Sequence, residues 1–179
     1  MENKERHSRL EFHRIAVAAR DIECAAQGFQ LILELNCEPA DNRYQTLLFG
    51  AVISYARPFT SNDGFGSLPK KWQKFYSHHL QEKHAEIIEY RNTVAAHSDI
   101  KHNKLYIYPR GNILQIGEKS HFLDEPAYAI TTPLLTKDEI PRYIELCQYQ
   151  HTRLLDATIE FIKGHYTQES GPFEFNYKE

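Results

Sequence analysis

The segment from Arg91 to His97 reads Arg-Asn-Thr-Val-Ala-Ala-His, and its residue types are suited to chemistry at a phosphate group. An arginine presents a planar fork that donates two hydrogen bonds to phosphoryl oxygens as negative charge builds on them. A histidine can move a proton near neutral pH, because its ordinary pKa lies close to that pH. Asn92 carries an amide that can orient either the phosphate or the histidine. Arg91, Asn92 and His97 are therefore candidate catalytic residues.

The spacing of Arg91 and His97 sets a condition on the local structure. On an unbroken α-helix, six residues turn a side chain through about 600°, which is about 240° beyond one full turn, and rise about 9 Å. The two side chains would then point to different faces of the helix. They can meet at one phosphate only if the helix ends or distorts before His97, or if a second copy of the chain supplies a partner.

Arg91 and His97 also have purely structural interpretations. Arg91 could pair with a nearby carboxylate, that of Glu86, Glu89 or Asp99. His97 stands near the expected end of a helix, where the helix dipole stabilises a cation by roughly 0.3–1 kcal/mol. These interpretations stay open at the level of sequence.

The same segment resembles the signature of the HEPN superfamily, R-x(4–6)-H, in which a polar residue often follows the arginine. Here five residues stand between Arg91 and His97, and Asn92 is the polar residue. The stretches 55–59 and 90–99 also resemble a poorly characterised branch of HEPN-like proteins. The resemblance extends over most of the expected helical frame, while the diagnostic motif itself is short.

This resemblance implies a metal-independent endoribonuclease that acts as a homodimer without a cofactor, often a toxin or a defence effector. In that reaction the RNA 2′-hydroxyl attacks the adjacent phosphorus, leaving a 2′,3′-cyclic phosphate and a free 5′-hydroxyl. Arg91 would stabilise the phosphoryl transition state and His97 would transfer the proton. Asn92 would position the phosphate or the histidine. Other HEPN proteins are catalytically inert. The alternative is therefore a non-catalytic helical module that binds a protein partner, regulatory or otherwise, or a nucleotide-containing ligand.

Three further residues are candidate substrate-binding groups: Arg57, Tyr90 and Ser98. Arg57 could lie beside Arg91 as a second phosphate ligand. Otherwise it is a cation at the end of a helix, where it complements the helix dipole. Tyr90 and Ser98 flank the motif and are candidates to bind or orient the substrate.

Two other groups of side chains carry weaker signals. Three histidines stand near two glutamates (His78, His79, His84, Glu82 and Glu86), but no His-Glu-x-x-His motif is present, so we expect a solvated polar face and no metal. A basic stretch around a tryptophan could steer a nucleic-acid strand, although such stretches are more often solvated helix faces. Its members are Lys70, Lys71, Trp72, Lys74 and Lys83.

The composition is that of an ordinary globular protein. Of the 179 residues, 41% are hydrophobic and 25% charged, which predicts one packed domain over residues 1–179. The net charge of −3 argues against coat-type binding to DNA, since phosphate neutralisation dominates such binding. No apolar run of about 18 residues and no signal peptide are found, so we expect a cytoplasmic protein without membrane contact. Small apolar neighbours predict that Cys24 is a core thiol.

Hydrophobic periodicity predicts a mainly α fold. Apolar residues recur at three- and four-residue spacing over 10–36, 43–57 and a bent region from 69 to 97, and again from between 136 and 139 to about 164. Such helices bury their apolar stripes most simply as an up-down four-helix bundle, which is also HEPN-like. Gly28, inside the first helix, is expected to mark close approach by a neighbour.

The period changes to two before the last helix. Runs 105–108 and 113–116 flank Pro109-Arg110-Gly111-Asn112, which predicts a small β-hairpin at about 104–118. Residues 118–135 are compatible with a strand and loop or with irregular chain. The turn-rich tail, about 166–179, carries alternating aromatic residues that could dock on the body.

Overall fold

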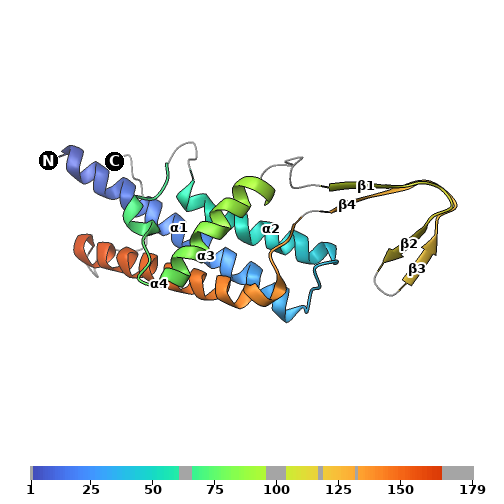
Figure 1. Ribbon diagram of the computed structural model, residues 1–179. Coiled ribbons are helices and arrows are strands. Elements are labelled where there is room, and N and C mark those ends of the chain that lie inside the picture. The colour runs from blue at the N-terminus through green and yellow to red at the C-terminus, as the bar shows by residue number, and fades with distance from the viewer. Residues whose placement is uncertain (1, 61–65, 96–103, 117–118, 132, 167–179) are drawn as a thin grey trace.

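The computed structural model describes residues 2–60, 66–95, 104–116, 119–131 and 133–166, and it is mainly helical (Figure 1). No helix within these residues is long and apolar enough to cross a membrane. The four α-helices are α1 (Glu2–Glu34), α2 (Asn42–Ala56), α3 (His78–Tyr90) and α4 (Ile140–His165). Short 3₁₀ turns, η1 (Arg57–Phe59), η2 (Lys70–Gln73) and η4 (Lys137–Glu139), connect them, and a π-helical turn, η3 (Arg91–Ala95), extends α3.

Helix α1 is the central element, with α2 and α4 packed along it. It runs antiparallel to α4, because Phe12 near its start stacks on Phe161 near the end of α4, with ring centroids 4.2 Å apart. Nearer its own end, Phe29 stacks on Tyr143 at 5.5 Å. Helix α3 crosses over this layer (Figure 1) and contacts both α2 and α4.

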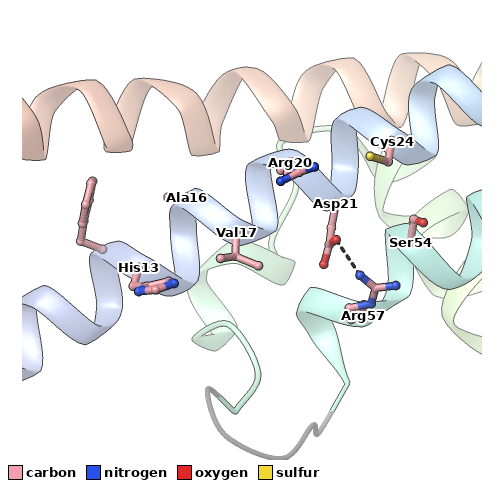
Figure 2. A pocket seen from close by; sticks show the side chains of 9 residues that line it. His13, Ala16, Val17, Arg20, Asp21, Cys24, Ser54 and Arg57 are labelled. Atoms are coloured by element: carbon pink, nitrogen blue, oxygen red, sulfur yellow. Dashed lines mark hydrogen bonds and ion pairs between the residues drawn. The ribbon is translucent and has the colours of Figure 1, made fainter. Parts of the chain in front are cut away.

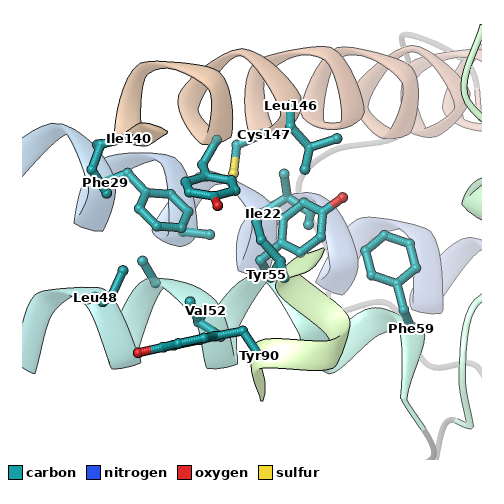
Figure 3. Close-up of a cluster of buried hydrophobic side chains, with 14 of the residues drawn as sticks. Ile22, Phe29, Leu48, Val52, Tyr55, Phe59, Tyr90, Ile140, Leu146 and Cys147 are labelled. Atoms are coloured by element: carbon teal, nitrogen blue, oxygen red, sulfur yellow. The ribbon is translucent and has the colours of Figure 1, made fainter. Parts of the chain in front are cut away.

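The core lies between these helices and contains large apolar side chains from all four. Phe29 and Ile22 of α1 face Leu48, Val52 and other residues of α2, and all four are fully buried (Figure 3). Burial of this kind, worth about 1.5–3 kcal/mol for each large side chain, supplies most of the stability of an amphipathic helix. The core thus fixes the position of α3 and of the residues that follow it.

The bounds of α2 and α4 are close to those predicted, α1 begins eight residues before the predicted residue 10, and the predicted third helix differs most. Helix α2 begins where expected, since the Asp41 side chain accepts a hydrogen bond of 2.8 Å from the Arg43 backbone N–H. The expected third helix from residue 69 is wrong. Only the short turn η2 forms there, and α3 begins at His78, directly after Ser77, whose backbone is extended. Trp72 in η2 is buried, so contacts with the core determine this segment.

The β structure is a longer ribbon than the predicted hairpin. Strand β1 (Lys104–Tyr108) pairs with β4 (Ala127–Thr131), and β2 (Ile113–Ile116) pairs with β3 (Lys119–Phe122), both antiparallel. The predicted pairing of 105–108 with 113–116 is therefore wrong. The Gly-Asn signal does make a turn, with Gly111 at φ 84°. However, Gly111 and Asn112 bond across to Leu123, so the turn is a kink within one side of the ribbon.

Gly28 marks a close approach of α1 to α2, as the sequence predicted. A Cβ added at Gly28 would lie 3.0 Å from the Cβ of Ala51, which is closer than real side chains normally come. Gly50, in α2, is a matched control because a Cβ there would meet nothing within 4 Å. The two glycines have the same intrinsic helix propensity, so a difference between them measures the packing alone.

We expect Gly50→Ala to raise the free energy of unfolding by up to about 1 kcal/mol, the usual gain from replacing helical glycine. For Gly28→Ala, overpacking of about 1–3 kcal/mol outweighs this gain, and a net loss of about 1 kcal/mol is expected. Urea unfolding of both variants measures the difference. Equal stabilisation by the two substitutions would show that α1 and α2 do not approach so closely.

Candidate functional site

Arg91 and Asn92 stand at the point where regular α-helix gives way to the π-helical turn η3. The last α-helical residue is Tyr90, and the Arg91 backbone N–H still bonds to the carbonyls of Ile87 and Ile88. Asn92 and Thr93 are weak helix formers, and the Thr93 hydroxyl donates to the Glu89 carbonyl at 2.9 Å. Such local competition with the helical bonds favours a wider turn, and π turns are frequent at functional sites.

The side chains of Arg91 and Asn92 contact one another. The Arg91 Nη1 donates to the Asn92 Oδ1 at 3.0 Å, and Asn92 is exposed while Arg91 is half-buried. A guanidinium has five N–H donors and this bond uses one of them. The amide nitrogen of Asn92 adds donors beside it. The pair is thus a small cationic, donor-rich unit at the end of α3, suited to the oxygens of an anion.

The proposed structural pairings of Arg91 are not found among the described residues. Within that part of the chain no ion pair joins Arg91 to a carboxylate. Glu86 instead binds Lys83 at 2.7 Å. Asp99 lies outside the described residues. The arginine is therefore not held in a buried salt bridge by the glutamates of its own helix.

His97 and Ser98 lie outside the described residues, so the distance between Arg91 and His97 is not described. The structure does meet the condition that the spacing imposes. The α-helix ends at Tyr90 and is replaced by a π turn over Arg91–Ala95, before His97 is reached. The side-chain directions calculated for an unbroken α-helix consequently do not apply to this segment.

Tyr90 belongs to the core and not to an open binding surface. It is only 8% exposed, and its ring lies 6.3 Å from that of Phe49. Its hydroxyl donates to the Pro133 carbonyl at 2.9 Å, which ties the end of α3 to the chain after β4. Burial, with a smaller effect of Tyr44, raises the pKa of Tyr90 well above its ordinary value. Its predicted contact with substrate is therefore replaced by a positioning contact.

Arg57 is separated from Arg91 by the length of the α2–α3 contact. Helix α3 runs antiparallel to α2, because Phe49 meets Tyr90 whereas Tyr55 meets His84. Arg57 follows Phe49 by eight residues, or about 12 Å of helix. Arg57 lies at the end of α2 and forms an ion pair of 2.9 Å with Asp21. The expectation that it joins Arg91 at one phosphate is not met by this arrangement.

A groove at the Arg57 end of α2 was not predicted from the sequence. It lies between α1 and the end of α2 (Figure 2) and has a volume of about 760 Å³. Its lining combines an apolar floor with two arginines and several small polar groups. The lining residues are Phe12, His13, Ala16, Val17, Arg20, Asp21, Cys24, Ser54 and Arg57. A volume of this size is typical of small-molecule sites.

The charges in this groove are predominantly cationic. Arg20 and Arg57 both line it, and the carboxylate of Asp21 is bound to Arg57. Burial raises the pKa of Asp21 above its ordinary value, although Arg57 and Arg20 act in the opposite direction. The groove therefore suits an anionic ligand with an apolar part. Cys24, predicted as a core thiol, is exposed here, whereas Cys37 and Cys147 are buried.

The histidine cluster and the basic stretch are mostly engaged within the fold. His84 is buried, and His78 pairs with Glu82 at 3.4 Å on the surface. Within the described ranges, no group of three metal-ligating side chains is close enough to hold an ion. Lys71 binds Glu11 at 2.7 Å. These contacts leave Arg91–Asn92 and the α1–α2 groove as the two candidate sites.

Comparison of the chain with models of protein families, with curated proteins and with solved structures gives no match. The two candidate sites and the resemblance carried by the motif are therefore the features that bear on the class of protein.

Proposed function

We propose that the chain is a metal-independent endoribonuclease of HEPN type that acts in the cytoplasm as a homodimer, as toxins and defence effectors of that kind do. The observation that carries this proposal is the contact of half-buried Arg91 with exposed Asn92 on a π turn, where Arg91 has no carboxylate partner in the described part of the chain. Helix α1 runs antiparallel to α2, since Gly28 meets Ala51 and Asp21 meets Arg57, and also antiparallel to α4, which supports the further proposal that the helices form an up-down four-helix bundle.

The chemistry assigns one task to each residue of the motif. As the RNA 2′-oxygen forms its bond to phosphorus, negative charge builds on the phosphoryl oxygens, and Arg91 stabilises it with paired hydrogen bonds. The bond from phosphorus to the 5′-oxygen breaks. His97 accepts the 2′-hydroxyl proton, and a proton from the resulting imidazolium or from water goes to the departing 5′-oxygen. Asn92 holds the guanidinium in position through the bond of 3.0 Å.

The test is cleavage of a mixed-sequence, end-labelled RNA in excess EDTA. We expect wild type to cut and to leave 2′,3′-cyclic phosphate ends. Arg91→Ala should reduce the rate by about 10²–10³-fold, the usual effect of removing a transition-state donor. His97→Ala should reduce it by about 10²–10⁴-fold. Arg142→Ala is the matched control, because Arg142 is an exposed arginine on α4, and it should leave cleavage unchanged.

The α1–α2 groove favours the second candidate function, a non-catalytic module that binds a nucleotide-containing ligand. Its two arginines and apolar floor suit a phosphate and a base on one molecule. Folded wild type that cuts no RNA, but whose unfolding temperature rises with AMP or ATP, would support this alternative. Arg20→Ala should then abolish the rise. Cutting that survives both Arg91→Ala and His97→Ala would contradict the nuclease assignment.

A further inference from the structure

The β-ribbon has an apolar face that nothing in the described chain covers. The ribbon extends away from the four helices (Figure 1), so no helix packs over it along most of its length. A two-stranded ribbon is marginally stable by itself in water, and it normally needs a third strand or a packed layer. Its side chains therefore show what kind of layer it requires.

The pairing of β1 with β4 places four large apolar residues on one face. Leu105 lies opposite Ile130, and Ile107 lies opposite Tyr128. Because side chains alternate along a strand, these two neighbouring pairs project to the same side. Their exposed fractions are 61%, 60%, 71% and 72% in that order. Every position of this face within the paired strands is apolar or aromatic.

The opposite face of the same strands is better covered. There Tyr106 lies opposite Ala129, and Tyr108 lies opposite Ala127. Tyr106 is 44% exposed and Tyr108 is half-buried. A bulky ring over a small residue shields much of the surface within the ribbon. The difference between the faces identifies the Leu105–Ile107–Tyr128–Ile130 face as the one that lacks a layer.

The area of this face matches a protein interface. With the exposed fractions above, the four residues present about 500 Å² of surface. A third exposed pair, Ile113 opposite Phe122, lies beyond the Gly111 kink and raises the exposed apolar surface of the whole ribbon to about 800 Å². A standard stable complex buries about 800 Å² on each partner. The ribbon alone therefore offers enough surface for one specific protein contact.

We propose that this face packs against the same face of a second copy of the chain. Two such faces match each other around a twofold axis, since each presents two rows of apolar pairs. They would form two β-layers about 10 Å apart, the usual spacing of packed sheets. A nucleic-acid strand is not the occupant we infer, because binding it requires cations and Lys104 lies on the opposite face with Tyr106.

The test is sedimentation equilibrium of the full chain over a range of concentrations. Wild type is expected to be a dimer, and Tyr128→Asp and Ile107→Glu should each raise its Kd at least tenfold, because a charge would be placed in an apolar contact. Tyr76→Asp is the matched control. Tyr76 is 78% exposed on the helical body, and its replacement should leave the dimer intact. Circular dichroism verifies that all three variants remain folded.

The proposal does not depend on RNA cleavage, which is assayed separately on the same proteins. A wild type that is monomeric at 100 µM, on the order of a hundredfold above a typical micromolar Kd, would overturn it. If that monomer bound to phosphatidylcholine vesicles, the apolar face would be assigned to contact with a lipid surface and not with a second copy of the chain. A dimer that persists in both ribbon variants would overturn the proposal as well, since the contact would then lie elsewhere.

Discussion

Lowering the pH from 7.5 to 5 is expected to reduce the free energy of unfolding by about 2 kcal/mol, because His84 must stay neutral in the folded protein. His84 is only 5% exposed and lies among aromatic rings. The Phe59 ring contacts it edge-on at 4.7 Å, and the Phe75 ring lies at 5.0 Å. Among the described residues, the only polar contact of its Nδ1 is the Tyr55 hydroxyl at 2.9 Å.

The sign of the effect follows from the pKa of His84. Burial lowers this pKa from 6.5 to about 4. Between these two values the unfolded chain binds a proton that the folded chain does not, so acid favours unfolding. The contribution of neutral His84 is complete above pH 6.5 and is lost as the pH falls from 6.5 towards 4. Tyr55 can donate to the neutral ring, since burial raises the pKa of its hydroxyl well above the ordinary value.

Urea unfolding at pH 7.5 and at pH 5, followed by the emission of the single tryptophan, measures this loss. Wild type and His78→Gln should both lose about 2 kcal/mol, because the side chain of His78 is 87% exposed. His84→Gln should be less stable at pH 7.5 but should lose much less on acidification. The comparison also removes the contribution of carboxylates such as Asp21. If His84→Gln and wild type lose equal amounts, His84 is not the titrating group.

Local signals explain why α2 was predicted well and the region before α3 was not. Asp41 caps α2 through a hydrogen bond within the same turn, and Pro58 ends regular helix at the other side, so both limits are encoded by adjacent residues. The turn η2 is fixed differently. Trp72 is held against α4, nearly eighty residues away, by the contacts of Gln150 and Arg153. Proline at residue 69 is equally compatible with a helix start, so sequence could not separate the two.

In the β-ribbon, too, local sequence signals predict the strands but not the partners with which they pair. Alternating apolar residues correctly predicted β1 and β2, and a Gly-Asn turn between them favoured a local hairpin. The actual partners lie further along the chain, where β4 pairs with β1. Pairing over such a distance depends on which apolar faces meet, and alternation does not specify that. The same alternation in 127–131 is weakened by alanines, which is why the sequence does not distinguish this strand from irregular chain.

For the candidate site, the spacing of residues was a better guide to the local structure than the types of residues were. The spacing in the motif required either a distortion before His97 or a partner from a second copy of the chain, and a π turn begins at Arg91. Tyr90 and Arg57 were selected by type or by nearness in sequence, and the helix order places one in the core and the other about 12 Å along α2. The groove was missed because Arg20 and Asp21 look like solvated helix residues. Their only signal in the sequence is that Val17 and Cys24 lie one turn before and one turn after them on the same side of the helix.

Gln150→Ala is expected to reduce the free energy of unfolding by about 3 kcal/mol, the second large effect predicted for this fold. Gln150 is a fully buried amide on α4. Its Nε2 donates to the Trp72 carbonyl at 3.0 Å, and its Oε1 accepts from Arg153 at 2.9 Å. Alanine would leave the Trp72 carbonyl without this donor and would open a cavity beneath η2.

Gln148→Ala is the matched control, since Gln148 is an exposed glutamine on the same helix and no side-chain hydrogen bond is recorded for it. It should change stability by less than about 0.5 kcal/mol. Tryptophan emission adds a local readout because Trp72 is the only tryptophan and is 7% exposed. In folded Gln150→Ala the emission should shift to longer wavelength, as η2 loosens and the ring meets water.

Agreement of the two glutamine variants within about 0.5 kcal/mol would contradict this account. The result also bears on the basic stretch of residues 70–74. If Gln150 and Arg153 hold Trp72 against α4, that ring is not free to stack on a nucleotide base, and the lysines beside it act only as surface charges. Any RNA contact would then depend on half-buried Arg91 and exposed Asn92, at the far end of α3 from this segment.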